Sequence, residues 1–245
     1  MQAIHWAADN CDVDALRREL ERGVDPDIIE GTWTPLQFLP FSRGGCSAQA
    51  LQCYRLLLAN GADVNVRDAV DDTKLHDASL TNNAELVALL LEAGAEVDVR
   101  NSQQNTPLHQ AARLGGVESA RLLLRAGAAL NVENEFGDTP LSGSLRTGYE
   151  RNFRVWPILL RAGANLPAET DQISYYARRY IQKVIDAGGW ANYERRHLDQ
   201  LTAMLTPKDQ PDERRRSRRR LSPLRRVPPE ILRKIAAFAF HAGYY

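Results

Sequence analysis

Two residue types recur along this chain with the same period. Threonines recur every 33 residues, at Thr73, Thr106 and Thr139. Glycines recur at the same interval, at Gly61, Gly94 and Gly127. A fixed period of this length is the sequence signature of a repeat protein, in which each unit contacts only its neighbours. The period therefore constrains the fold to a stack of similar units.

The residues around these markers predict a pair of helices in each unit. Thr supplies a side-chain oxygen for the free N–H groups at a helix start, and Pro beside it has the backbone angle that helix entry needs. The second helix carries three consecutive leucines, an apolar stripe too wide for one helix pair to bury alone. The glycine that follows fits the left-handed position that closes a helix. We therefore expect neighbouring units to stack and to bury the leucine stripes, which include Leu89, Leu90, Leu91, Leu122, Leu123 and Leu124.

Similar segments surround the markers in each unit. The helix starts read TPLQFL at Thr34, TKLHDA at Thr73, TPLHQAA at Thr106 and TPLSGS at Thr139, and the second helices end in LLLANGADVN, LLLEAGAEVD, LLLRAGAALN and ILLRAGANL. These segments resemble the ankyrin repeat family, whose signature is T-P-L-H-x-A with a 33-residue period. A first repeat without its hairpin is similar in AIHWAA and LRRELERGVDPD. The resemblance covers residues 1–167 and implies an all-α solenoid of about five repeats, with short β-hairpin turns between stacked helix pairs.

Two repeats depart from the regular spacing. The interval from the Thr marker to the Gly marker is 27 residues in the second repeat and 24 in the fifth, where the third and fourth repeats have 21. Both excesses fall between the paired helices. Residues 40–49 and 144–153 are therefore predicted to form lengthened surface loops, which a solenoid tolerates because each repeat contacts only its neighbours.

The chain beyond residue 167 divides into three further segments. Residues 168–206 keep a helical period on both sides of Gly188 and Gly189, which predicts a helical hairpin that covers the end of the last repeat. Residues 207–226 are Arg-rich without an apolar period, which is typical of a flexible linker. Residues 227–245 place Pro at a helix start and apolar residues on one face, which predicts an amphipathic helix that must dock on another surface.

The C-terminal end carries two further resemblances. The segment VPPEIL is similar to the opening LPxEIL of an F-box, the element by which substrate receptors join a ubiquitin ligase, and the similarity covers only the first helix of that module. The segments AGGW, YE and HAGYY resemble the ends of uncharacterised ankyrin proteins of unicellular algae and protists.

The formal net charge of zero conceals an uneven distribution. Residues 208–234 carry eleven basic and four acidic residues, so residues 1–207 carry a net charge of −7. Three cysteines, Cys11, Cys46 and Cys53, lack CxxC spacing and favour a reducing compartment over a disulfide framework. The sequence shows neither a signal peptide nor an 18-residue apolar run. We therefore expect a monomeric intracellular protein, in the cytoplasm and also the nucleus, without membrane association.

The sequence predicts neither a catalytic residue nor a metal site. His5, His76 and His109 fall in equivalent slots of successive helices, roughly 8 to 10 Å apart by helix-packing distances, which is too far for one zinc ion. The ankyrin resemblance implies that this His makes hydrogen bonds between repeats. Cys53 falls in an apolar core slot, and Cys11 lies where the family often has Gly. Because GxSxG, HExxH, P-loop and dinucleotide fingerprints are missing, we expect no enzyme, no cofactor and no small-molecule substrate.

Solenoid stacking aligns the hairpin tips and the outer positions of each first helix on one concave face, which is the expected protein-binding surface. Several of these positions are apolar where solvent should reach, and Trp and Arg are favoured interface anchors. The alternative is that the tip aromatics fold back onto their own hairpins or onto the long loops. The candidate contact residues are Trp33, Phe41, Val70, Leu80, Arg113, Leu114, Phe136 and Arg146.

The basic run RRRSRRR is a candidate nuclear import signal, composed of Arg214, Arg215, Arg216, Arg218, Arg219 and Arg220. The same run also suits a solvated linker or a patch that binds an anionic surface. It could also bind residues 1–207, whose net charge is −7, through an electrostatic contact that salt would weaken. Because aromatic residues are not interleaved with the arginines, sequence-specific nucleic-acid binding is not expected.

These features together predict a non-catalytic scaffold or adaptor that binds a protein partner on its concave ankyrin face. One alternative is a substrate receptor of a ubiquitin ligase, recruited through residues 227–245. Another is a nuclear or nucleic-acid-associated regulator that acts through the Arg run. The identity of the partner does not follow from the sequence, because one fold serves unrelated pathways.

Overall fold

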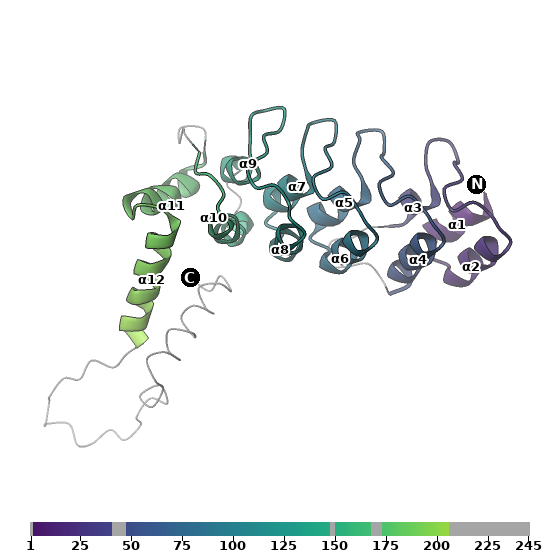
Figure 1. The fold of residues 1–245 in the computed structure, drawn as a ribbon, viewed down its shortest axis with the longest axis horizontal. Coiled ribbons are helices and arrows are strands. Elements are labelled where there is room, and N and C mark those ends of the chain that lie inside the picture. Colours follow the sequence, from purple (N-terminus) through teal and green to yellow (C-terminus); the bar gives the residue numbers. More distant parts are fainter. Residues whose placement is uncertain (1, 41–47, 148–149, 168–172, 206–245) are drawn as a thin grey trace, which may run out of the picture. The chain divides into compact units, whose positions relative to one another are not determined.

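The computed structural model describes residues 2–40, 48–147, 150–167 and 173–205 (Figure 1). The chain divides into two compact units, Met1–Ala177 and Arg178–Tyr245. The predicted linker at 207–226 and the predicted amphipathic helix at 227–245 lie outside the described residues. None of the helices in the described ranges is long and apolar enough to span a membrane.

The first unit contains five helix pairs that lie side by side, with a hairpin-shaped loop projecting from the same edge between successive pairs (Figure 1). The described residues form no strand, and the first hairpin contains only an isolated antiparallel bridge between Glu30 and Trp33. The pairs are α1 (Ala3–Asp9) with α2 (Val13–Glu21), α3 (Pro35–Phe38) with α4 (Ala48–Ala59), α5 (Lys74–Thr81) with α6 (Ala84–Glu92), α7 (Pro107–Arg113) with α8 (Val117–Arg125), and α9 (Pro140–Thr147) with α10 (Trp156–Ala162). First helices pack on neighbouring first helices in the pairs α1 with α3, α5 with α7 and α7 with α9, and second helices do so in the pairs α2 with α4, α6 with α8 and α8 with α10.

The leucine stripes are buried by stacking, as the period predicts. The middle leucine of each triplet is fully buried, at Leu57, Leu90 and Leu123, while its two neighbours are half-buried. Burial of one large aliphatic side chain contributes about 1.5–3 kcal/mol relative to leaving it exposed. The repeated leucines are therefore a main source of stability for the array, and one repeat alone would expose them.

The Thr markers occupy matching helix starts. The Thr73 and Thr106 side chains accept from the third backbone N–H of their helices, and the N3 side chain bonds back to the N-cap backbone in each case. The second repeat builds the same capping box between Thr34 and Gln37. Gly94 and Gly127 then end the second helices at φ 89° and 93°. The local chemistry expected from the markers is confirmed.

The predicted surface loop at residues 144–153 is wrong. Helix α9 continues to Thr147, and a 3₁₀ helix, η1 (Glu150–Arg154), follows. Asn152 is fully buried, and its Nδ2 donates to the Ser144 carbonyl at 3.2 Å and to Thr147 Oγ1 at 2.9 Å. The extra residues of this repeat therefore fold back against the end of α9. In the other predicted loop, residues 48 and 49 already belong to α4, and residues 41–47 lie outside the described residues.

Two helices follow the repeats. Helix α11 (Tyr175–Asp186) and helix α12 (Trp190–Leu205) are separated at Gly188 and Gly189, which have φ values of 80° and 104°. In the second unit the rings of Tyr180 and Tyr193 meet edge to face, with their centroids 5.9 Å apart. The idea that this hairpin covers the last repeat stays a prediction.

Candidate protein-binding surface

The second, third and fourth hairpin loops are each shaped by one polar side chain at the turn, which is Asp68, Asn101 or Asn134. Asp68 Oδ1 accepts the backbone N–H groups of Val70 and Asp72, both at 2.9 Å. Asn134 Oδ1 accepts those of Phe136 and Asp138 at 2.9 and 3.0 Å. Side chains of Asp and Asn form such turns because their oxygen reaches the backbone two residues further on. The tip residues are therefore held in a defined conformation.

Neighbouring hairpins are also tied to one another. The Ser102 N–H donates to the Val70 carbonyl at 3.0 Å, and the Glu135 N–H donates to the Gln103 carbonyl at 3.1 Å. A side-chain bond from Asn101 Nδ2 to Asp72 Oδ1, at 2.8 Å, runs parallel to the first of these. Together the tips, at residues 30–33, 69–70, 102–103 and 135–136, form an edge that we call the tip row. Its last three members are in fixed register.

The three equivalent histidines connect each first helix to the next hairpin. Nε2 of His5, His76 and His109 bonds to the carbonyl oxygens of Trp33, Asn105 and Asp138, at 3.1, 3.0 and 3.0 Å. In His76 and His109, Nδ1 accepts the backbone N–H of the capping Thr, so the neutral ring carries its proton on Nε2. The expectation that these residues bond between repeats is confirmed. The described residues contain no group of three or more metal-ligating side chains.

Burial lowers the pKa of two of these rings. The pKa of His109 falls to about 4, because desolvation disfavours the charged imidazolium and the Arg100 charge adds to the effect. Burial likewise lowers the pKa of His76. Both rings are therefore neutral at physiological pH and act as uncharged connectors.

The expected tip residues are exposed. Trp33 keeps 40% of its surface accessible, Val70 51% and Phe136 61%. The Trp33 ring also meets Phe38 edge to face, with centroids 6.3 Å apart, so it packs partly on its own repeat. These three side chains stand on the tip row as exposed apolar groups, and their contact with a partner stays a prediction.

The helix-end candidates differ in accessibility. Leu80 and Leu114 are half-buried, so they add less apolar surface than the sequence alone suggests. Arg113 and Arg146 are exposed, and the Arg146 guanidinium forms an ion pair with Asp138. Phe41 lies outside the described residues.

Other exposed apolar residues were missed by sequence reasoning. Trp6 on α1 is 50% exposed and lines a hollow between α1 and α2 together with Arg18 and Arg22. Ile29, in the first hairpin, is 62% exposed. Trp6 occupies the position directly after His5, and a comparison of that position among repeats would have singled it out.

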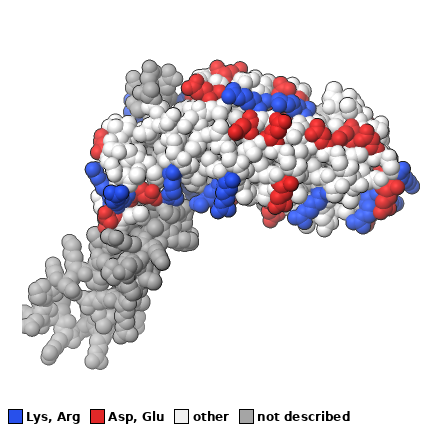
Figure 2. All heavy atoms as spheres, in the orientation of Figure 1, with Lys and Arg blue, Asp and Glu red and all other residues white. Residues whose placement is uncertain are grey.

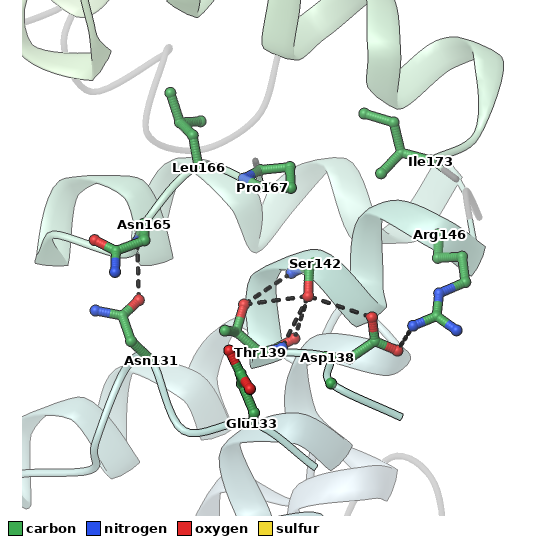
Figure 3. Close-up of a pocket in the computed structure, with 11 residues that line it drawn as sticks. Asn131, Glu133, Asp138, Thr139, Ser142, Arg146, Asn165, Leu166, Pro167 and Ile173 are labelled. Atoms are coloured by element: carbon green, nitrogen blue, oxygen red, sulfur yellow. Dashed lines mark hydrogen bonds and ion pairs between the residues drawn. The ribbon is translucent and has the colours of Figure 1, made fainter. Parts of the chain in front are cut away.

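A cavity of about 360 Å³, lined by both polar and apolar side chains, lies at the start of α9 (Figure 3). Ser142 lines it and occupies the slot that His76 and His109 fill in earlier repeats. The Ser142 hydroxyl accepts the Thr139 N–H at 2.8 Å, but a short side chain leaves the space that an imidazole would take. Residues 168–172, which connect two segments of the cavity rim, lie outside the described residues.

The hairpin loops are strongly acidic. Residues 24–33, 62–72, 95–105 and 128–138 contain twelve Asp and Glu residues but only Arg67 and Arg100 as basic residues, a net charge of −10. Figure 2 shows acidic side chains along the upper part of the repeat array, over the hairpins, with a shorter row of basic side chains among them. The negative charge of the body is therefore concentrated beside the tip row.

Stacked helix pairs with hydrogen-bonded hairpins and a solvent-facing row of tips define a solenoid of the protein-binding class. A family model described as ankyrin repeats in three copies matches residues 45–134 and 75–169, which together make up half of the chain. The chain belongs to the ankyrin repeat family. Repeats of this kind serve protein–protein interaction. A comparison with curated proteins finds no match.

Proposed function

We propose that this protein is a non-catalytic adaptor that holds a protein partner on its tip row and on the adjoining ends of the first helices. One observation carries the proposal: Trp33, Val70 and Phe136 expose apolar surface on an edge whose hairpins are held by hydrogen bonds. These side chains lie on three of the four hairpins, and each offers a partner apolar surface to bury at an interface.

The rigidity of the tips supports the same proposal. Turn bonds from Asp68 and Asn134 and backbone bonds between hairpins fix the tips of the last three hairpins before any partner arrives. Binding of a partner then costs little conformational entropy, because the tips are already ordered in the folded chain. Arg113 and Arg146 extend the surface along the ends of α7 and α9.

The experiment is affinity capture with the full chain as bait. The variant Trp33→Ala, Val70→Ala, Phe136→Ala should lose the proteins that the wild type captures, since it removes the exposed anchors. The matched control, Tyr175→Ala with Ile185→Ala, removes exposed apolar surface from α11 and should retain them. Urea denaturation of each variant confirms an unchanged fold. Capture that survives the triple change, or fails equally in the control, would contradict the proposal.

The proposal includes an intracellular location, nuclear as well as cytoplasmic, supported by the basic run and by an odd number of cysteines without CxxC spacing. Fluorescent fusions test it. Replacing the six arginines of residues 214–220 with Gln should reduce the nuclear share of the signal, and an unchanged distribution would refute an import role. The ubiquitin-ligase and nucleic-acid alternatives rest on residues outside the described ranges and stay predictions.

A further inference from the structure

A hollow of about 220 Å³ opens on the tip row between the last two hairpins and helices α7 and α9. Its wall includes Phe136 from the hairpin, Arg113 from α7, and Gly143 and Arg146 from α9. Small-molecule sites usually measure roughly 300–1,000 Å³. The hollow is therefore of the size that suits one large side chain rather than a metabolite.

Gly143 is the residue that keeps this hollow open. It lies four residues after Thr139, and the same position carries Asp77 in α5 and Gln110 in α7. The three atoms nearest to a Cβ added at Gly143 belong to Asp138 and lie at 3.5 to 3.8 Å, which is ordinary van der Waals contact. Glycine is one of the least favourable residues inside a helix. Since crowding does not demand a glycine here, its effect is to leave space where the preceding repeats place a side chain.

The rim of the hollow favours an apolar occupant. The Phe136 ring beside it is 61% exposed and offers an aromatic face. The Arg146 guanidinium forms an ion pair with the Asp138 carboxylate, so the two charges at the rim of the hollow largely cancel. Burial of a large apolar side chain against such walls is the usual form of an interface anchor.

The charge of the surface around the hollow favours particular residues on either side of the anchor side chain in the partner. A segment that runs along the tip row passes the hairpin loops, whose net charge is −10. Burial raises the pKa of Asp77 to about 6; the Lys74 charge opposes this rise, and the neighbouring Asp72 and Asp68 charges add to it. A field of one sign attracts the opposite charge and repels its own.

We propose that this hollow is the anchor subsite of the tip row, and that it takes one large apolar side chain from a partner segment otherwise rich in Lys and Arg. The inference rests on the proposed function and names the chemistry of its partner. The field of the hairpins disfavours acidic segments and favours basic segments over neutral ones, and segments without the apolar residue leave the hollow unfilled.

The test uses a phage-displayed library of random 12-residue peptides selected on the full chain. Selected sequences should contain one Leu, Ile, Met, Phe or Trp among several Lys and Arg. Gly143→Leu, which fills the hollow, should weaken a selected peptide by about tenfold or more, as loss of an interface anchor does. Gly143→Ala is the matched control, because it alters helix propensity but fills little of the space, and it should bind nearly as the wild type does.

A second variant tests the charge without touching the hollow. Asp71→Asn, Glu133→Gln and Glu135→Gln together neutralise three exposed carboxylates and should weaken the same peptides, with a smaller dependence on salt than the wild type shows. Selection of acidic or neutral peptides, or equal affinity of Gly143→Leu and wild type, would overturn the inference. Loss of binding in the Trp33, Val70 and Phe136 variant but not in Gly143→Leu would leave the proposed function standing without this subsite.

Discussion

The neutral His109 ring makes the stability of the repeat array depend on pH. Its Nδ1 accepts the Thr106 N–H at 3.0 Å, and its Nε2–H donates to the Asp138 carbonyl at 3.0 Å. A protonated ring would lose the first bond and carry a charge at a site where only 6% of the residue is exposed. Folding therefore favours the neutral form.

The size of the effect follows from the two pKa values. The pKa of His109 is about 4 in the folded chain, against 6.5 for an ordinary histidine. Between these values the unfolded chain binds a proton that the folded chain does not, so stability is complete above pH 6.5 and falls as the pH drops to about 4. Because each pH unit of difference is worth about 1.4 kcal/mol, the total loss is about 3 kcal/mol, of which about 2 kcal/mol appears by pH 5.

A matched variant isolates this contribution. Gln37 fills the same slot in the second repeat, where it accepts the Thr34 N–H at 2.8 Å and donates to the Arg67 carbonyl at 3.0 Å. His109→Gln should therefore keep both bonds without a titrating group. Urea denaturation at pH 7.5, 6 and 5 measures both proteins, and the shared contributions of His76 and Asp77 cancel in the difference. If the variant loses as much free energy of unfolding as the wild type between pH 7.5 and 5, the reasoning is refuted.

Four further substitutions test the packing and the helix ends by urea denaturation. Gly143→Ala should raise the free energy of unfolding by about 0.5–1 kcal/mol, because the helix gains propensity without a clash; a loss would mean that the backbone there needs glycine. Cys11 has a φ of 53°, so Cys11→Gly should gain about 1 kcal/mol, and a destabilised variant would count against strain. Leu90→Ala should cost about 2–5 kcal/mol and exceed Leu91→Ala, since only Leu90 is fully buried; equal costs would contradict the stacking.

The helix starts could be predicted from the sequence because helix capping is local. Thr73 and Thr106 each complete the capping box with the residue three positions later in the chain, so a short stretch of sequence is enough to predict it. The left-handed positions follow in the same way. Cys11, expected where the family has Gly, does adopt a positive φ, as do Asn82 and Gly115 at the same position of later repeats.

The fate of the extra residues in the fifth repeat could not be predicted in this way. The excess length showed where residues had been added but not what they would contact. The conformation of these residues depends on Asn152, whose side chain donates a hydrogen bond to the carbonyl of Ser144 in α9, eight residues earlier in the chain. Such a contact appears only when the neighbouring helix is placed.

The candidate surface was predictable to a similar degree. Exposure of Trp33, Val70 and Phe136 follows from their place in the hairpins, which the repeat register supplies. The half-buried state of Leu80 and Leu114 depends on neighbouring helices and did not follow. The hollow beside Gly143 was not anticipated, because a missing side chain creates a feature only among the side chains around it.

The position four residues after the Thr marker shows how a regular array acquires an individual surface. The helices form with very different residues there, so the fold does not dictate the choice; the residues are Trp6, Phe38, Asp77, Gln110 and Gly143. Their exposure ranges from a buried Gln110 to a half-exposed Trp6. Positions that the fold requires, such as the capping Thr and the central Leu, are instead nearly invariant within the chain. Because stability resides in the repeated positions, the variable one is free to set shape and charge along the surface, and recognition of a partner should depend mainly on it and on the hairpin tips.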